Sequence, residues 1–394
     1  MKKHLVLGAL AVLSLAACTK SEVVELNKGN EISLTAVTGK NLTKAADGYC
    51  NSAMPADFAV WAATDGKKYF EAQTYKRDGT SNTYKGESAR YWPTTAVDFF
   101  AAKNYKGDSS PAPTPTFTAS GTTALAINGY EVTTTVASQK DFIYAVTKDA
   151  TKAGGAAPLY FRHALSQIEF QAKNQNAGIH VEISEVTIKN VYSKGNFSVN
   201  AATTDKYENH THDETADTDT RTGRCSWASQ STTADYTISF SPAVDVKNNG
   251  SADLSVKDPT DPIVKEYNAR TMYLIPQTVA NIWDGSGQPT SEQAYFLINA
   301  IIYNVAGSEV DKSKDVVLWG TKTGSTYTSK PIAVPLPTTT IWEDGLRYVY
   351  TFNFTTTGTG GVDPGTGDPV LTPITLSVTV DDFVDAGNTD VNVK

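Results

Sequence analysis

The sequence predicts a mostly β protein, and three observations support this fold class. Short runs rich in Val, Ile, Thr, Tyr and Phe alternate with Gly, Asn, Asp and Pro, which are typical of turns. The good helix formers are not grouped at helical spacing over any long window. The composition, 40% hydrophobic and 19% charged, is that of a chain with a substantial core. We therefore expect short helical turns at most.

The N-terminus has the pattern of an export signal. Lys2 and Lys3 precede a 13-residue apolar run, Leu5 to Ala17, which is shorter than the roughly 20 residues a membrane span needs. The run ends in small residues directly before Cys18, as in a bacterial lipobox. We expect residues 1–17 to be a lipoprotein signal peptide, with Cys18 as the acylated, palmitate-bearing first residue of the mature chain.

The charge and the missing motifs exclude several classes of function. The chain carries 34 basic and 42 acidic residues, for a net charge of -8 that becomes -10 without the signal peptide. No basic stripe is present, so we expect no nucleic acid partner. The sequence also lacks the common nucleophile, zinc-protease and phosphate-loop motifs. We therefore predict no enzymatic activity and no cofactor.

The mature chain begins with a tether and a strand. Residues 18–30 are polar, without apolar periodicity, and predict a tether between the lipid and the fold. The next segment, Glu31 to Val37, alternates with Ile32, Leu34 and Ala36 on one face. This alternation is typical of a half-buried strand.

Similar patterns predict strands through the remainder of the chain, at Asp57–Ala63, Ala96–Ala102, Asp141–Thr147, Ser166–Ala172, Val181–Val191, Tyr236–Phe240, Thr271–Ile275, Tyr295–Val305 and Leu346–Phe354. The length of 394 residues exceeds the usual limit of roughly 250 to 300 residues for one core, so we expect two domains. Ala201 to Asp219 is polar and cannot fill a core. It suggests domains at 31–205 and 206–394.

The chain closes with another predicted strand. Residues 355–372 are rich in Gly and Pro and indicate a flexible linker or a long loop. After this segment four apolar residues alternate with polar ones, namely Ile374, Leu376, Val378 and Val380. We therefore expect a strand with one apolar face, attached by a loose segment.

The cysteines and histidines do not define a site. After export Cys50 and Cys225 could pair in a disulfide, or both could be buried free thiols. His210 and His212 are the best candidate metal ligands, because alternate positions of an extended segment project to the same side. They lack a third ligand at a fixed geometry, so we expect a solvated loop and no metal.

Several segments in order resemble the fimbrillin family of Bacteroidetes, the lipoprotein-derived type V pilins. They are the lipobox, Ile32–Val37 followed by Leu42–Ala45, Leu159–Ser166, Tyr273–Gln277 and Trp342–Tyr348. The likeness covers nearly the whole mature chain. It implies two tandem transthyretin-like β-sandwich domains in a surface-exposed subunit of a fimbria or related adhesin, held at the outer membrane by its lipid.

The resemblance also implies maturation by a trypsin-like surface protease. In fimbrillins the protease cuts after a basic residue in the loop behind the first strand. In this chain that residue is Lys44, with Ala45 as the new N-terminus, and Lys40 is a second basic residue in the same loop. The best-known family members have Arg at the cut, so the Lys is a departure.

Strand exchange between subunits is the assembly step that the resemblance implies. The displaced strand carries Ile32, Leu34 and Ala36. The donor strand from a neighbouring fimbrillin subunit carries Ile374, Leu376, Val378 and Val380. Open backbone groups of a sheet accept such a strand by β-augmentation. Whether the subunit is a stalk, an anchor or a tip is left open.

A non-polymerising surface lipoprotein that binds glycans is the alternative. It would share the anchor and the β domains but would display a cluster of exposed aromatic side chains. The six tryptophans are scattered singly, and core packing is the default for such residues. The aromatic residues therefore do not favour this alternative.

Overall fold

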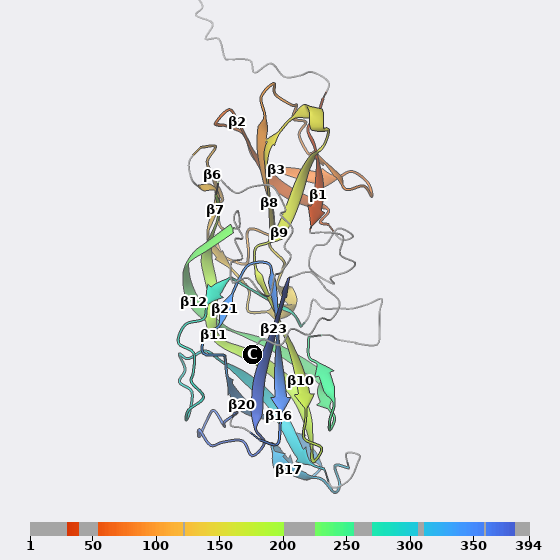
Figure 1. Cartoon of the computed structure of the whole chain (residues 1–394), viewed down its shortest axis with the longest axis vertical. Coiled ribbons are helices and arrows are strands. Elements are labelled where there is room, and N and C mark those ends of the chain that lie inside the picture. Colours follow the sequence, from red (N-terminus) through yellow and green to blue (C-terminus); the bar gives the residue numbers. More distant parts are fainter. Residues whose placement is uncertain are drawn as a thin grey trace, which may run out of the picture.

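The structure is a computed structural model that describes residues 30–38, 54–120, 123–200, 225–255, 270–305, 311–357 and 360–382. These residues form β strands together with two 3-10 turns, η1 (Val136–Ser138) and η2 (Lys152–Gly154). The prediction of a mostly β fold is confirmed. An N-terminal barrel and a C-terminal pair of sheets follow one another along the long axis (Figure 1). In the described part of the chain no helix is long and apolar enough to cross a membrane.

The N-terminal barrel is a closed circuit of seven strands in the order β1-β4-β3-β2-β5-β8-β9. The strands are β1 (Ser33–Thr38), β2 (Asp57–Thr64), β3 (Lys67–Arg77), β4 (Thr83–Gly86), β5 (Val97–Lys103), β8 (Ile143–Ala150) and β9 (Ala157–His163). The resemblance implied a sandwich here. The circuit closes instead because β1 pairs with β4 on one side and with β9 on the other.

Two sheets form the C-terminal part. The first runs β13-β10-β22-β23, with β14 beside β10: β10 (Ser166–Asn174), β13 (Ser251–Asp253), β14 (Met272–Leu274), β22 (Leu346–Phe354) and β23 (Ile374–Asp382). The second runs β17-β16-β11-β7-β6, with β12 beside β11 and β20 beside β16: β6 (Thr116–Phe117), β7 (Thr123–Glu131), β11 (Ile179–Asn200), β12 (Cys225–Val246), β16 (Tyr295–Asn304), β17 (Val316–Trp319) and β20 (Lys330–Pro335). Small pairs join β15 (Gln277–Thr278) to β21 (Ile341–Trp342), and β18 (Thr321–Thr323) to β19 (Thr326–Thr328).

These two sheets pack face to face through aromatic side chains. The ring of Phe296 on β16 lies 5.7 Å from Phe170 on β10 and 4.9 Å from Tyr350 on β22, between ring centroids. All three residues belong to the main hydrophobic core. Aromatic pairs at such distances favour tilted and edge-to-face contacts. The C-terminal part is therefore a two-layer sandwich.

The last barrel strand, β9, is followed after Ala164 and Leu165 by the sandwich strand β10, whereas β6 and β7 leave the barrel earlier, between β5 and β8, and pair in the second sheet. The division expected from composition, 31–205 and 206–394, falls within residues 201–224, which are not described. This segment connects β11 to β12, and these two strands are paired along most of their length. Its polar composition therefore marks a connection inside one sheet, which composition alone cannot distinguish from a domain boundary.

One face of the barrel packs into the core of the sandwich. Trp61, Phe100 and Tyr144 belong to barrel strands, yet their side chains belong to the main core with those of the sandwich. The Trp227 indole Nε1 donates to the Ala164 carbonyl oxygen at 2.7 Å, at the passage between the two parts. These contacts hold the barrel and the sandwich together.

Candidate functional site

The candidate site is the place of β1 in the barrel. Ile32, Leu34 and Ala36 are each 0% exposed and point into the barrel core, whereas Ser33 and Thr35 are partly exposed. The alternation in the sequence is therefore matched by burial. Burying Ile32 and Leu34 contributes about 3–6 kcal/mol before ordering costs.

Two strands hold β1 by their backbones. It runs antiparallel to β4, with Leu34 opposite Tyr84, and parallel to β9, with Leu34 opposite Ala157. Further backbone bonds run from the Ile32 N–H to the Arg90 carbonyl oxygen at 2.7 Å and from the Ala36 N–H to the Asn82 carbonyl oxygen at 3.2 Å. The barrel has no edge while β1 is present. Without β1, both β4 and β9 would present unpaired backbone groups.

Aromatic side chains line the space beneath β1. The Phe58 ring lies 4.6 Å from the Tyr84 ring and 5.0 Å from the Phe161 ring, between centroids. The Tyr84 hydroxyl donates to the Pro55 carbonyl oxygen at 2.7 Å, which fixes this ring against the barrel end. These three residues come from β2, β4 and β9. Removal of β1 would therefore leave an apolar groove with rigid walls.

The barrel interior is a poor environment for charge. Tyr75 is 0% exposed, and its hydroxyl has no hydrogen-bond partner among the described residues. Burial raises the pKa of this phenol well above its usual value, and the nearby Arg90 guanidinium opposes the shift only in part. An ionised side chain placed here would lose its hydration without gaining a partner.

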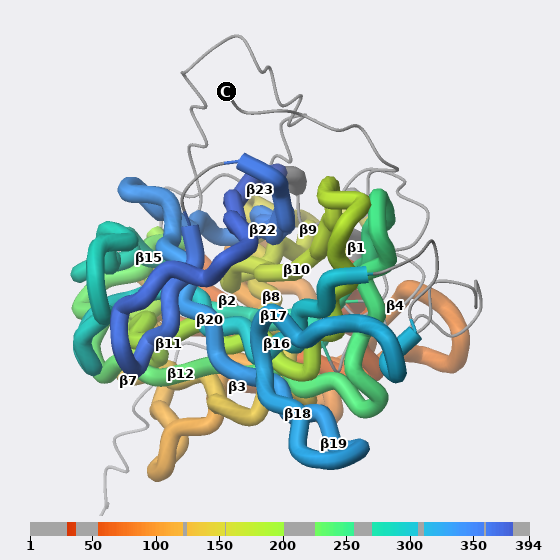
Figure 2. The backbone as a smooth tube through the Cα atoms, turned by 90° about the horizontal axis from the view of Figure 1, so that it is seen from below, coloured from red at the N-terminus to blue at the C-terminus, as the bar shows by residue number. Residues whose placement is uncertain are grey.

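The predicted donor strand, β23, lies at a sheet edge beside β22, as Figure 2 shows from below. It pairs antiparallel with β22 over nine residue pairs, from Phe354 opposite Ile374 to Leu346 opposite Asp382. Ile374 is 1% exposed, while Leu376, Val378 and Val380 are partly buried and pack against the main core. The apolar face is therefore packed within its own chain, and in the described part of the sheet no strand lies beyond β23.

The residues predicted for processing lie outside the described part of the chain. These are Cys18, Lys40, Lys44 and Ala45, and the same holds for Cys50 and for the histidine pair His210 and His212. Cys225 is buried in the structure, and its N–H donates to the Tyr144 hydroxyl at 2.8 Å. The possible disulfide to Cys50 therefore stays a prediction.

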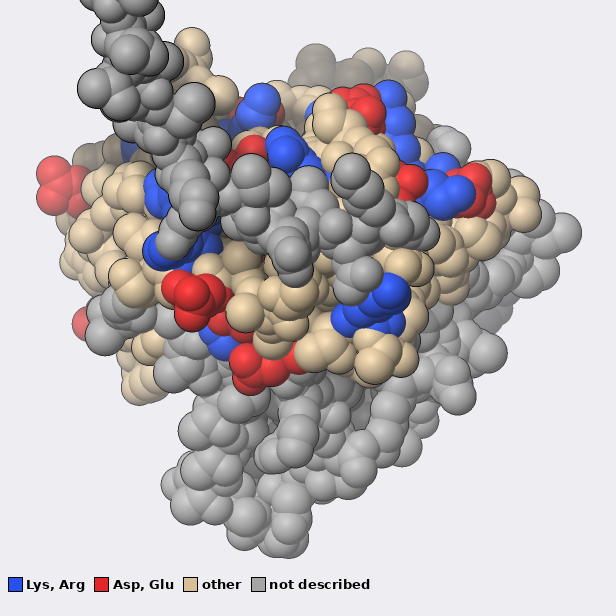
Figure 3. All heavy atoms as spheres, turned by 90° about the horizontal axis from the view of Figure 1, so that it is seen from above, with Lys and Arg blue, Asp and Glu red and all other residues tan. Residues whose placement is uncertain are grey.

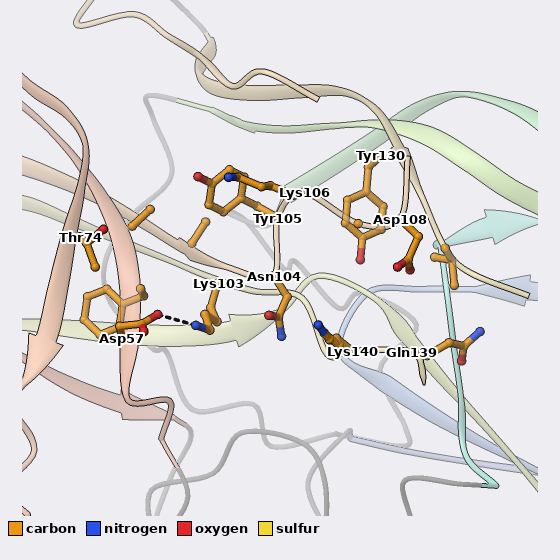
Figure 4. Close-up of a pocket in the computed structure, with 15 residues that line it drawn as sticks. Asp57, Thr74, Lys103, Asn104, Tyr105, Lys106, Asp108, Tyr130, Gln139 and Lys140 are labelled. Carbon is orange, nitrogen blue, oxygen red and sulfur yellow. Dashed lines mark hydrogen bonds and ion pairs between the residues drawn. The ribbon is translucent and has the colours of Figure 1, made fainter. Parts of the chain in front are cut away.

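A pocket of about 330 Å³ lies where the barrel meets the sandwich (Figure 4). The Lys103 ammonium and the Asp57 carboxylate pair across it at 2.5 Å. Asp108 accepts the N–H of Thr133 at 3.2 Å. Gln139 accepts the N–H of Tyr273 at 2.7 Å. Of these three contacts, the bond from Tyr273 on β14 to Gln139 ties the segment before β8 to the sandwich.

The other candidate residues have structural roles. His163 pairs with Asp141 at 2.9 Å and His180 with Asp245 at 2.5 Å, and both rings are mostly buried. No metal-binding group of three side chains occurs among the described residues. Four of the six tryptophans, at positions 61, 92, 283 and 342, are nearly fully buried. This burial is the core packing that the sequence predicted.

The barrel end seen from above carries basic and acidic side chains in alternation (Figure 3). Exposed ion pairs on the barrel join Lys68 to Glu71, Lys76 to Glu87 and Lys85 to Asp78, at 2.6 to 2.8 Å. All are well exposed, so each adds little stability. This face does not present an extended surface of one charge.

Sequence reasoning missed the residues that form the groove walls. Phe58, Tyr84 and Phe161 lie far apart in the sequence and meet only through the barrel circuit. The available signal was weak, because each residue lies in a short run that also fits an ordinary buried strand. The acceptor side of the site is therefore visible only in three dimensions.

The molecule is an all-β protein with two parts. Its closed barrel has a first strand that bridges two others, and its sandwich has an edge strand at the end. These are the two positions that strand exchange between subunits would use. The chain belongs to the fimbrillin-like family, whose family model matches residues 19–382. This match confirms the family resemblance seen in the sequence. No curated relative matches the chain.

The chain is also similar to solved structures at low sequence identity. The tip fimbrial protein Mfa3 from Porphyromonas gingivalis is 9% identical, with 89% of this chain and 99% of that chain covered and a TM-score of 0.37. A fimbrilin from the same species is 11% identical, with 93% and 100% covered and a TM-score of 0.37. A Bacteroides ovatus structure is 13% identical, with 91% and 99% covered and a TM-score of 0.43. The family assignment rests on the sequence match.

Proposed function

We propose that this chain is a structural subunit of a cell-surface fimbria that mediates adhesion. Membership of the fimbrillin-like family supports the fimbrial role. The observation that carries the assembly mechanism is the double pairing of β1, which closes the barrel between β4 and β9. A strand in this position can be replaced by any chain that offers the same backbone pairing and an apolar face.

Strand exchange would be driven by the difference between two apolar faces. The face of β1 holds Ile32, Leu34 and Ala36, whereas the face of β23 of a neighbouring subunit holds four aliphatic side chains and is larger in total. Burying four aliphatic side chains from water contributes roughly 6–12 kcal/mol before ordering costs. Because Ile374 is already buried and the other three pack against their own sandwich, the net gain on transfer is smaller, and the open barrel edges also regain their backbone pairing. The partners are further copies of this chain or other fimbrillin subunits. Once β1 has left, exchange therefore favours the polymer.

The whole proposal is tested by the size of the mature chain before and after limited trypsin treatment. We expect a monomer before treatment and oligomers afterwards, because only cleavage releases β1. A chain that is cut between residues 38 and 54 and remains monomeric at high concentration would refute assembly by strand exchange.

Lipidation at Cys18 would hold the precursor at the outer membrane. We expect Cys18→Ser to abolish acylation, because the thiol is the group that accepts the lipid. Labelling with a palmitate analogue and phase partitioning measure this directly. Cys225→Ser is the matched control, since its thiol is buried in the fold. A Cys18→Ser chain that still carries label would refute the lipoprotein assignment.

Cleavage behind Lys44 would separate β1 from the remainder of the subunit. The described part of β1 ends at Thr38, so a cut at this position leaves residues 30–38 held only by pairing and packing. We expect subunits from assembled fimbriae to begin at Ala45, as read by N-terminal sequencing. A Lys44→Gln chain should stay uncut there, and assembled subunits that begin at Cys18 would exclude this maturation.

A further inference from the structure

Residues 360–370 form a small hairpin that is attached to the edge of β20. Val362 and Ala333 exchange both backbone hydrogen bonds, at 2.9 and 3.0 Å. Within the hairpin Val362 also bridges to Pro369, and the Val370 N–H donates to the Gly361 carbonyl oxygen at 3.0 Å. Val362 and Val370 are 7% and 6% exposed. Backbone pairing and burial therefore both hold the hairpin on the sandwich.

The glycines of this hairpin serve close packing. A Cβ on Gly361, where φ is +85°, would lie 3.0 Å from Cγ2 of Ile332. A Cβ on Gly367, where φ is +78°, would lie 2.8 Å from the backbone N of Gln288. Both positions require a residue without a side chain. The Gly/Pro-rich composition, which suggested a flexible linker, thus belongs to an anchored segment.

Few backbone hydrogen bonds hold the chain between this hairpin and β23. Leu371 is 78% exposed, although its neighbours Val370 and Thr372 are buried. Pro373 has no N–H, and within the described residues the N–H groups of Leu371 and Thr372 donate no backbone hydrogen bond. Pairing resumes at Pro373, whose carbonyl oxygen accepts the Thr355 N–H at 2.9 Å, and continues at Ile374, whose N–H donates to the Gly360 carbonyl oxygen at 3.0 Å.

We propose that the hairpin 360–370 stays on β20 when β23 leaves its sheet, so that the donor arm begins at Leu371 and turns on residues 371–373. This inference rests on the proposed strand exchange. It limits the described arm to residues 371–382, which span roughly 40 Å when extended. A loose chain from residue 355 would span roughly 90 Å. With the hairpin held on β20, the acceptor barrel must therefore lie close to the donor sandwich.

Two engineered disulfides in the full chain separate the arm from the anchor. Thr351→Cys with Ser377→Cys joins paired positions of β22 and β23, and Ala333→Cys with Val362→Cys joins the hairpin to β20. Directly paired residues of antiparallel strands lie within the Cα separation that a disulfide needs. We call the disulfide between β22 and β23 the arm lock and the disulfide between the hairpin and β20 the anchor lock. After limited trypsin treatment, we expect the oxidised arm lock to prevent assembly and the oxidised anchor lock to permit it.

Reduction is the matched control, since it should restore assembly of the arm-locked chain. An oxidised anchor lock that also prevents assembly would overturn the inference, because the hairpin would then have to detach. An oxidised arm lock that assembles normally would instead refute the donor role of β23. These results distinguish the inference from the proposed function.

Hydrogen exchange of the intact precursor tests the anchor without any assembly. The amides of Val362 and Val370 should exchange at least tenfold more slowly than those of Ser377 and Thr379, which point toward β22, because the strand can open while the hairpin stays paired. Equal rates for both groups would show that hairpin and strand open as one unit, and would overturn the inference whatever the outcome of assembly.

Discussion

Leu34→Ala is expected to lower the free energy of unfolding of the precursor by about 2–5 kcal/mol. Leu34 is 0% exposed and lies between Tyr84 of β4 and Ala157 of β9. Both neighbours are parts of a closed circuit, so the walls cannot collapse fully into the space that the substitution leaves. Urea denaturation of the uncut chain, followed by tyrosine and tryptophan fluorescence, measures the change.

The matched control is Thr35→Ala, one residue further along the same strand. Thr35 is partly exposed and lies on the opposite face, so we expect a change within about 0.5 kcal/mol. Equal losses from both substitutions would mean that burial in the barrel does not set the stability of β1.

Leu34→Ala has a second consequence after assembly. If β1 has left the subunit, fibres of the Leu34→Ala chain should dissociate at the same temperature as parent fibres. The large effect on the precursor and the absence of an effect on the fibre together follow only from loss of the strand. A fibre that is weakened as much as the precursor would show that β1 is retained.

Val378→Asp is expected to prevent assembly after cleavage while leaving the precursor folded. In the precursor Val378 is partly buried on an edge strand, so the carboxylate can turn toward water and we expect a loss of about 1–3 kcal/mol. In the acceptor barrel the same carboxylate would enter the interior where burial raises the pKa of Tyr75. The cost there is several kcal/mol unless a partner is found.

Ser377→Asp is the matched control for this substitution. It adds the same charge to the neighbouring residue, whose side chain is exposed and faces away from the apolar face. Its precursor should unfold like the parent, and its cut form should assemble. Size-exclusion chromatography and electron microscopy of trypsin-treated samples record the outcome. Assembly of the Val378→Asp chain at the parent level would refute a donor face at residues 374–380.

The two sides of the site differ in how far the sequence reveals them. The apolar faces of β1 and β23 follow from alternation, since a period of two places Ile32 and Leu34, or Ile374 and Leu376, on one side of a strand. The groove that receives a strand combines Phe58, Tyr84 and Phe161 from three strands. No local pattern joins these residues, because their proximity depends on the order of strands in the barrel.

The glycines near the C-terminus also separate what the sequence reveals from what only the fold decides. Composition marks residues 355–372 as a break between strands, and the break is real. It does not distinguish a glycine that provides freedom from one that allows close contact, as at Gly361 and Gly367. That distinction depends on which atoms lie next to the missing side chain, and those atoms belong to distant segments.

The sequence by itself determined the mostly β class, the positions of several strands and the buried face of β1, because side-chain alternation records locally which face avoids water. Tertiary structure alone decided that β1 lies parallel to β9, more than a hundred residues later, and that β6 and β7 join the sandwich although barrel strands come before and after them in the chain. Backbone groups pair with whichever edge the whole fold brings alongside, and every strand offers the same donors and acceptors. The pairing partner is therefore settled by packing of the complete chain.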